Sequence, residues 1–63
     1  MAATDEQIAA AWASYVGVLQ DRRSVVKWKK IPATMQEAVT ETHRQTYPDE
    51  YDAMVAAVHA VCK

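Results

Sequence analysis

The sequence predicts an all-α protein, a compact bundle of three main helices with a short fourth helix between the first and the second. Apolar residues recur at helical spacing, capping signals precede these stretches, and both prolines fall at their boundaries. The chain has 63 residues, which suffices for one domain, so residues 1–63 are interpreted as a single helical domain.

The first helix is expected over residues 5–21. The sequence T-D-E-Q from Thr4 to Gln7 is a capping box, in which the side chain of each of these two residues can bond the backbone N–H of the other. Because a longer helix would place Arg22 and Arg23 on the buried side, we expect the helix to end or bend near them. The apolar stripe of this helix consists of Ile8, Trp12, Tyr15, Val16 and Leu19.

Residues 21–31, D-R-R-S-V-V-K-W-K-K-I, leave several structures open. Ser24 could cap a short helix, a short extended piece would also fit, and the stretch could be disordered when the protein is free. We favour the short helix, because the Ile31-Pro32 pair would end it.

The next helix is expected to start at a second capping box, formed by Thr34 and Glu37, and to end near Thr46. On its outer side Arg44 can pair with Glu41 at i,i+3 spacing. Its inward stripe is weak and consists of Met35, Ala38, Val39, Thr42 and Thr46.

The last helix follows Tyr47, and Pro48 suits its first position, where the missing N–H would have no intrahelical partner. Acidic residues in the first turns favour the positive end of the helix dipole. Together the helices predict a core of Ile8, Trp12, Val16, Leu19, Val26, Met35, Val39, Tyr51, Met54, Val55, Val58 and Cys62.

Composition narrows the compartment and the class of protein. With one cysteine the chain can form no internal disulfide, which favours a reducing, cytoplasmic location. No apolar run is long enough to span a membrane, and the acidic N-terminus is not that of a signal peptide. A chain with its own start methionine is expected to be a small complete protein.

Neither a metal site nor an active site is predicted, and no cofactor is expected. His59 and Cys62 have a spacing that two metal ligands could share, but His43 is the only other donor of this kind. Glu37 and Glu41 share a helix face from which His43 points away, so they are interpreted as surface carboxylates. The single glycine excludes a phosphate-binding loop, and the protein is expected not to be an enzyme.

The basic stretch within residues 21–31, which contains five cations and Trp28, carries the strongest functional signal. A tryptophan among cations is typical of a binding hot spot, so the predicted partner is a larger protein with an acidic surface. Alternatively, the apolar residues of this stretch plug the open end of the bundle, and the cations form a solvated rim. The predicted partner-binding residues are Arg22, Arg23, Lys27, Trp28, Lys29 and Lys30.

A nucleic-acid partner is the alternative. Val25 and Trp28, followed by basic residues and Ile31-Pro32, resemble the recognition-helix end of small phage-type helix-turn-helix repressors. That resemblance implies DNA binding through the same cations, although Leu19 stands where the turn glycine of that family would lie.

Self-association is a further expectation, because small residues line two helix faces. Gly17 costs about 1 kcal/mol in a helix relative to alanine, which suggests the close approach of another helix. The candidate residues are Ala10, Ala13 and Gly17 on the first helix and Ala53, Ala56 and Ala60 on the last. The sequence thus predicts a small protein-binding regulator or inhibitor, of a size typical of prokaryotic or phage-encoded ones, that acts by occupying a partner surface.

Overall fold

The computed structural model describes residues 2–62, which form three α-helices and one 3₁₀ turn, with no β-strand among them. The helices are α1 (Asp5–Arg23), α2 (Ala33–Thr46) and α3 (Pro48–Val61), and the turn η1 (Trp28–Lys30) lies between α1 and α2. The predicted all-α class is confirmed. The predicted short helix is present only as the single turn η1.

The starts of α1 and α3 follow the sequence signals. Thr4 Oγ1 accepts the backbone N–H of Gln7 at 3.2 Å, and Gln7 Oε1 accepts the N–H of Thr4 at 2.9 Å. Pro48 is the first residue of α3, where it removes no intrahelical hydrogen bond. Both predicted helix starts are therefore confirmed.

The end of α1 lies where it was expected, near Arg22 and Arg23. The helix continues past Asp21 to Arg23, and the N–H of Ser24 bonds the carbonyl of Gln20. Arg22 and Arg23 nevertheless remain exposed.

The predicted capping box that starts α2 is wrong. The helix begins at Ala33, and Pro32 is its N-cap, with a carbonyl that accepts the N–H of Gln36 at 2.9 Å. No side chain caps this end, and Thr34 lies inside the first turn. Proline fixes the backbone angle φ close to a value that suits this boundary, so no side-chain cap is needed to start the helix.

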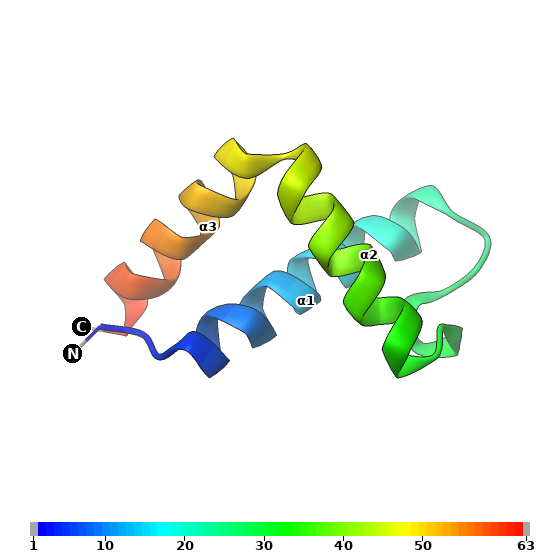
Figure 1. The fold of residues 1–63 in the computed structure, drawn as a ribbon, viewed down its shortest axis with the longest axis horizontal. Helices are drawn as coiled ribbons and strands as arrows, with labels where there is room; N and C mark the ends of the chain where they lie inside the picture. Colours follow the sequence, from blue (N-terminus) through cyan, green and yellow to red (C-terminus); the bar gives the residue numbers. More distant parts are fainter. Residues whose placement is uncertain (1, 63) are drawn as a thin grey trace.

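The three helices form the predicted compact bundle, in which each helix contacts the other two. In Figure 1, α1 and α3 make a V that closes where the two ends of the chain meet, and α2 crosses α1 towards its other end. The closed end is fastened by the N–H of Ala3, which donates to Nδ1 of His59 at 3.0 Å. The loop that follows α1 and the turn η1 lie at the opposite end of the molecule (Figure 1).

The core is centred on Trp12. Its ring stacks on Tyr15 at 5.2 Å, meets the ring of Tyr51 edge-on at 5.1 Å, and donates its Nε1–H to the carbonyl of Thr40 at 3.0 Å. Trp12 thus joins all three helices, and Trp12 and Val16 are the buried hydrophobic residues among those described. The other predicted core residues with partial burial are Ile8, Leu19, Val39, Tyr51, Met54, Val55, Val58 and Cys62.

Two predicted core residues lie outside it. Val26 is 50% exposed and Met35 is 55% exposed. The inward stripe predicted for α2 is also largely wrong, because α2 makes its interhelical contacts through Gln36, Thr40 and His43. Polar groups at a helix contact need hydrogen-bond partners, and this requirement overrides a weak apolar stripe.

Tyr15 links α1 to α3. Its hydroxyl donates to Oε2 of Glu50 at 3.0 Å, and Nε2 of His43 in α2 lies 3.8 Å from the same oxygen. Because the protonated tyrosine makes this bond, the hydrogen bond to Glu50 raises the pKa of Tyr15 above its ordinary value of 10.0. The fold therefore favours the neutral form of Tyr15.

This link predicts a change of stability at alkaline pH. The stability that it contributes is present below pH 10.0 and is lost as the pH rises through the higher pKa of folded Tyr15. We expect the melting temperature of the wild type to fall more steeply above pH 10.0 than that of Tyr15→Phe. The difference should be small, because the pair is exposed. Melting curves by circular dichroism test this, and equal slopes for the two proteins would contradict it.

Candidate functional site

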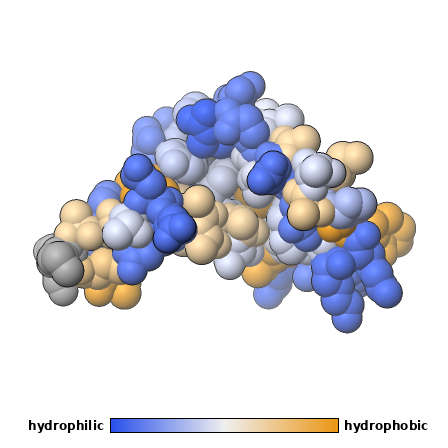
Figure 2. Space-filling model, turned by 60° about the horizontal axis from the view of Figure 1, so that its bottom comes forward, coloured by the Kyte–Doolittle hydropathy of each residue, from blue (hydrophilic) through white to orange (hydrophobic). Residues whose placement is uncertain are grey.

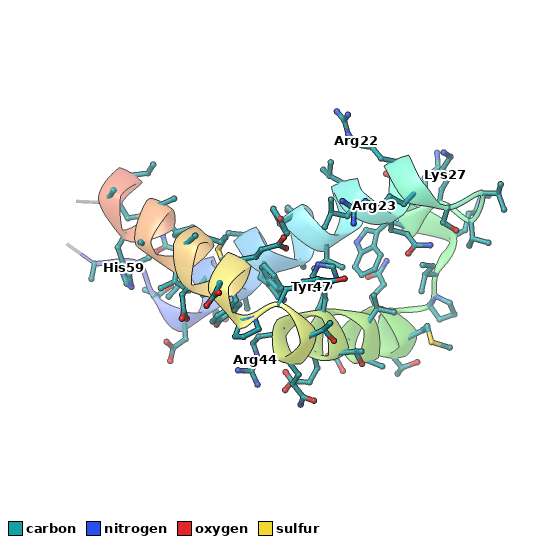
Figure 3. All side chains as sticks on the ribbon, turned by 90° about the horizontal axis from the view of Figure 1, so that it is seen from above. Arg22, Arg23, Lys27, Arg44, Tyr47 and His59 are labelled. Atoms are coloured by element: carbon teal, nitrogen blue, oxygen red, sulfur yellow. The ribbon has the colours of Figure 1, made fainter. Side chains whose placement is uncertain are left out.

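The candidate surface lies at the end of α1 away from the termini. Here the last turn of α1, the following loop and η1 bring together five exposed cations. In Figure 3 the side chain of Arg22 points away from the helices, and Lys27 lies beside the C-terminal end of α1. The structure thus gathers at one end all the basic residues predicted for partner binding: Arg22, Arg23, Lys27, Lys29 and Lys30.

Two valines at this end were not predicted as binding residues. Val25 is 95% exposed, and Val26 is half exposed. The loop that carries them is tethered by its own polar groups: Ser24 Oγ accepts the N–H of Val26 at 3.2 Å, and Gln20 Nε2 donates to its carbonyl at 2.9 Å. An apolar pair is therefore held in solvent by an ordered backbone. On the face in Figure 2, hydrophobic and hydrophilic side chains adjoin at the end opposite the termini.

Asp21 organises this end. Its Oδ1 accepts the backbone N–H of Trp28 at 2.8 Å, and its backbone carbonyl accepts from Nζ of Lys27 at 3.0 Å. The sequence carried a signal for this role that was not used. An acidic side chain in the last turn of a helix lies at the negative end of the helix dipole, which is unfavourable. Its presence there suggests that it binds a group outside the helix.

Trp28 packs against the protein more than it faces solvent. A Cβ built on the buried Gly17 would lie 2.8 Å from Cδ1 of Trp28, so the indole lies directly on the glycine. The carbonyl of Trp28 accepts from Nε2 of Gln36 at 2.8 Å, which ties it to α2. Trp28 and the half-buried Ile31 therefore fit the predicted plug, whereas Val25 and Val26 do not.

An open hollow of about 450 Å³ adjoins the outer edge of Trp28. Its lining consists of Asp21, Lys27, Trp28 and Lys29. One edge of the indole is therefore available to a ligand at this end, beside two cations. The rest of the ring is engaged within the chain.

The residues predicted for self-association are separated by the fold. Gly17 is buried, and its close neighbour is the side chain of Trp28, where the sequence suggested another helix. Ala13 is half-buried beside Trp28 and α2, and Ala10 is exposed. On α3 the three alanines Ala53, Ala56 and Ala60 are all exposed.

The histidines and the cysteine lie apart. His59 bonds the N–H of Ala3, and His43 packs against Trp12 with ring centroids 5.5 Å apart. Cys62 is half-buried at the end of α3. Within residues 2–62, no group of three or more histidine, cysteine or acidic side chains could hold a metal ion.

The carboxylates of α2 have surface roles. Glu41 pairs with Arg44 at i,i+3 as predicted, with Nε of Arg44 donating at 3.1 Å. This hydrogen bond lowers the pKa of Glu41 and raises that of Arg44. Glu37 is exposed on the same helix.

Comparison with protein-family models, curated proteins and solved structures found no match to this chain. No helix within residues 2–62 is both long and apolar enough to cross a membrane. The feature that suggests a function is therefore the surface at the end of α1. We call it the basic tip, and it consists of Arg22, Arg23, Val25, Val26, Lys27, Lys29 and Lys30.

Proposed function

We propose that this chain is a non-enzymatic binding protein that uses the basic tip to occupy an acidic surface of a larger protein. The observation that carries the proposal is the pair of exposed valines, Val25 and Val26, on a tethered loop among five exposed cations. Binding would block or reshape the partner surface, so the chain would act as a regulator or inhibitor. A cytoplasmic location is part of the proposal.

The combination of residue types favours a protein partner. Burying aliphatic surface contributes about 25 cal/mol per Å², and the valines would gain this only against another apolar surface. The surrounding cations steer the encounter and favour a partner whose rim is acidic. Val25 and Val26 replace Trp28 as the proposed anchors, because most of the indole is already engaged with Gly17.

The tethered loop suits this role energetically. Its hydrogen bonds from Ser24 and Gln20 limit the conformations of the free protein, so less ordering is required when a partner binds. In the loop conformation that these bonds hold, both valine side chains are exposed to solvent.

DNA binding remains the second candidate, because the same five cations could contact phosphates. Positions 24–31 contain the three-residue turn η1 and no α-helix, so the recognition helix implied by the helix-turn-helix resemblance is not formed there. Binding of this kind would rest on phosphate contacts alone. It would weaken steeply and log-linearly with salt, whereas a protein interface anchored by valines would keep much of its affinity.

The proposal predicts the result of a capture experiment from cell lysate. Tagged wild-type protein should retain a discrete protein with or without nuclease, and the double variant Val25→Asp/Val26→Asp should lose it. Reversing the charges of Arg22 and Lys27 should weaken retention mainly by slowing association. Ser14→Glu is the matched control, because Ser14 is exposed on α1 outside the basic tip.

Two outcomes would overturn the proposal. Retained material that disappears with nuclease, and that is indifferent to the valine substitutions, would favour DNA binding. A retained protein that Val25→Asp/Val26→Asp still captures as well as the wild type would place the contact surface elsewhere.

A further inference from the structure

The side of α2 predicted to face the core is open to solvent. Met35 is 55% exposed and Tyr47 is 43% exposed, and between them the surface is hollowed into an open, mainly apolar groove of about 450 Å³. The distance along the helix from Met35 to Tyr47 is about 18 Å. We call this surface the α2 stripe, and its members are Met35, Ala38, Val39, Thr42, Thr46 and Tyr47, with His43 also lining the groove.

The segments that precede and follow α2 carry opposite charge. Lys29 and Lys30 in η1 precede the start of α2, and Asp49 and Asp52 in the first turns of α3 follow its end. All four side chains are exposed, and no ion pair within residues 2–62 engages them.

The flank of the stripe between these ends is neutral. It presents the exposed side chains of Thr34 and Gln45, while the nearby Glu41 is paired with Arg44. Along this flank, the charge therefore runs from positive before α2, through neutral on α2, to negative after it, while the exposed Glu37 lies on another face of α2.

We propose that two copies of this chain pair through the α2 stripe, with the two α2 helices antiparallel about a twofold axis. A twofold interface must be complementary to itself. If one residue of the first copy contacts a second residue of the other copy, the same two residues also meet with the copies exchanged. The antiparallel arrangement places Lys29 and Lys30 of each copy opposite Asp49 and Asp52 of the other. A parallel arrangement would bring like charges together.

The middle of the stripe fits a twofold contact. The axis passes near Ala38 and Thr42, whose small side chains allow the two helices to approach closely. Met35 of each copy then lies against the Thr46 end of the other, where the groove is open.

Pairing through α2 would also enlarge the core. The described monomer buries only two hydrophobic side chains, Trp12 and Val16, and small domains commonly gain stability by association. Arg22, Val25, Val26 and Lys27 stay outside the interface, whereas Lys29 and Lys30 of the basic tip take part in it, so each dimer would present two smaller basic tips. The inference does not rest on the proposed function, and Thr42→Glu, which lies outside the basic tip, tests the pairing separately from it.

Sedimentation equilibrium of the untagged chain from micromolar to millimolar concentration tests the pairing. The apparent mass should rise from 7.0 kDa towards twice that value. Thr42→Glu should raise the dimer dissociation constant roughly tenfold or more, because two carboxylates would meet near the axis. Ser14→Glu, on the outer side of α1, should leave it unchanged. Circular dichroism should show that both variants keep their helices.

A charge exchange makes the test specific for the antiparallel arrangement. Lys29→Glu/Lys30→Glu alone would place acids against acids, and Asp49→Lys/Asp52→Lys alone would place cations against cations, so each variant should be largely monomeric. The combined variant Lys29→Glu/Lys30→Glu/Asp49→Lys/Asp52→Lys should dimerise with itself, because both ends again pair opposite charges. It should not dimerise with the wild type, because antiparallel pairing would then place like charges at both ends.

A monomeric mass at every concentration of wild-type protein would overturn the inference. Wild-type dimers that tolerate Thr42→Glu, or a combined charge variant that does not dimerise with itself, would also overturn it. They would show that the interface lies on another face, such as that of Ala53, Ala56 and Ala60.

Discussion

Replacing Trp12 with alanine is expected to unfold most of the protein at room temperature. Trp12 is 4% exposed and contacts residues of all three helices. Removing a buried tryptophan costs about 3–5 kcal/mol. The free energy of unfolding of a domain is about 0.05–0.15 kcal/mol per residue, which is about 3–9 kcal/mol for 63 residues. Trp12 and Val16 are the buried hydrophobic residues among those described, so we expect this chain near the lower bound, where the loss takes most of its stability. Urea titration followed by circular dichroism measures the effect.

Two further variants separate the contributions of Trp12. Trp12→Phe keeps an aromatic ring but removes the donor to the carbonyl of Thr40, and should cost about 1–3 kcal/mol. Val61→Ala is the control, because Val61 is 85% exposed and its truncation should stay within about 0.5 kcal/mol. If Trp12→Ala unfolds at the same urea concentration as Val61→Ala, the stability of this fold does not depend on the aromatic cluster.

The sequence predicted the parts of the fold that are set locally. The Thr4 capping box and the position of Pro48 each depend on residues that are neighbours in the chain, and both are observed. Trp12 was also assigned correctly to the core, because it lies on the apolar stripe of the first helix, but its central place among the three helices was not predicted. The start of α2 failed because two local signals competed, and Pro32 determined the boundary while Thr34 did not.

The errors in the core arise from contacts between distant residues. Met35 and Val26 were assigned to the core by spacing, but the bonds from Trp12 to Thr40 and from Gln36 to Trp28 determine how α2 is rotated. Such bonds join positions far apart in the chain, and helical periodicity carries no information about them. In a chain with so few large apolar residues, a few polar bonds decide which face is buried.

The basic tip was predicted in composition but not in its anchors. The five cations are adjacent in sequence, so their clustering needed no knowledge of the fold. The replacement of Trp28 by Val25 and Val26 as the proposed anchors could not be predicted without the fold, because it depends on the contact between Trp28 and Gly17. The glycine itself was a signal: its cost in a helix implied a close neighbour, although not which one.

That contact makes a second prediction, in which the effect of one substitution changes sign. Gly17→Ala in an unconstrained helix interior would stabilise the protein by about 1 kcal/mol. Here the new methyl group would lie 2.8 Å from Cδ1 and 3.0 Å from Cγ of Trp28. Cγ lies next to the backbone, and that backbone is bonded to both Asp21 and Gln36, so the ring cannot move aside freely. Overpacking costs about 1–3 kcal/mol, so we expect Gly17→Ala to destabilise the wild type.

The same substitution in a Trp28→Ala background should stabilise the protein, because the obstacle is gone and only the helix preference of alanine remains. A double-mutant cycle measured by urea titration gives the coupling between the two positions, which should be about 1–3 kcal/mol. The indole N–H resonance of Trp28 should also shift in Gly17→Ala, while that of Trp12, bonded to Thr40, should not. If Gly17→Ala is equally stabilising in both backgrounds, Trp28 does not rest on Gly17. The indole would then be free to serve as the anchor that the sequence first suggested.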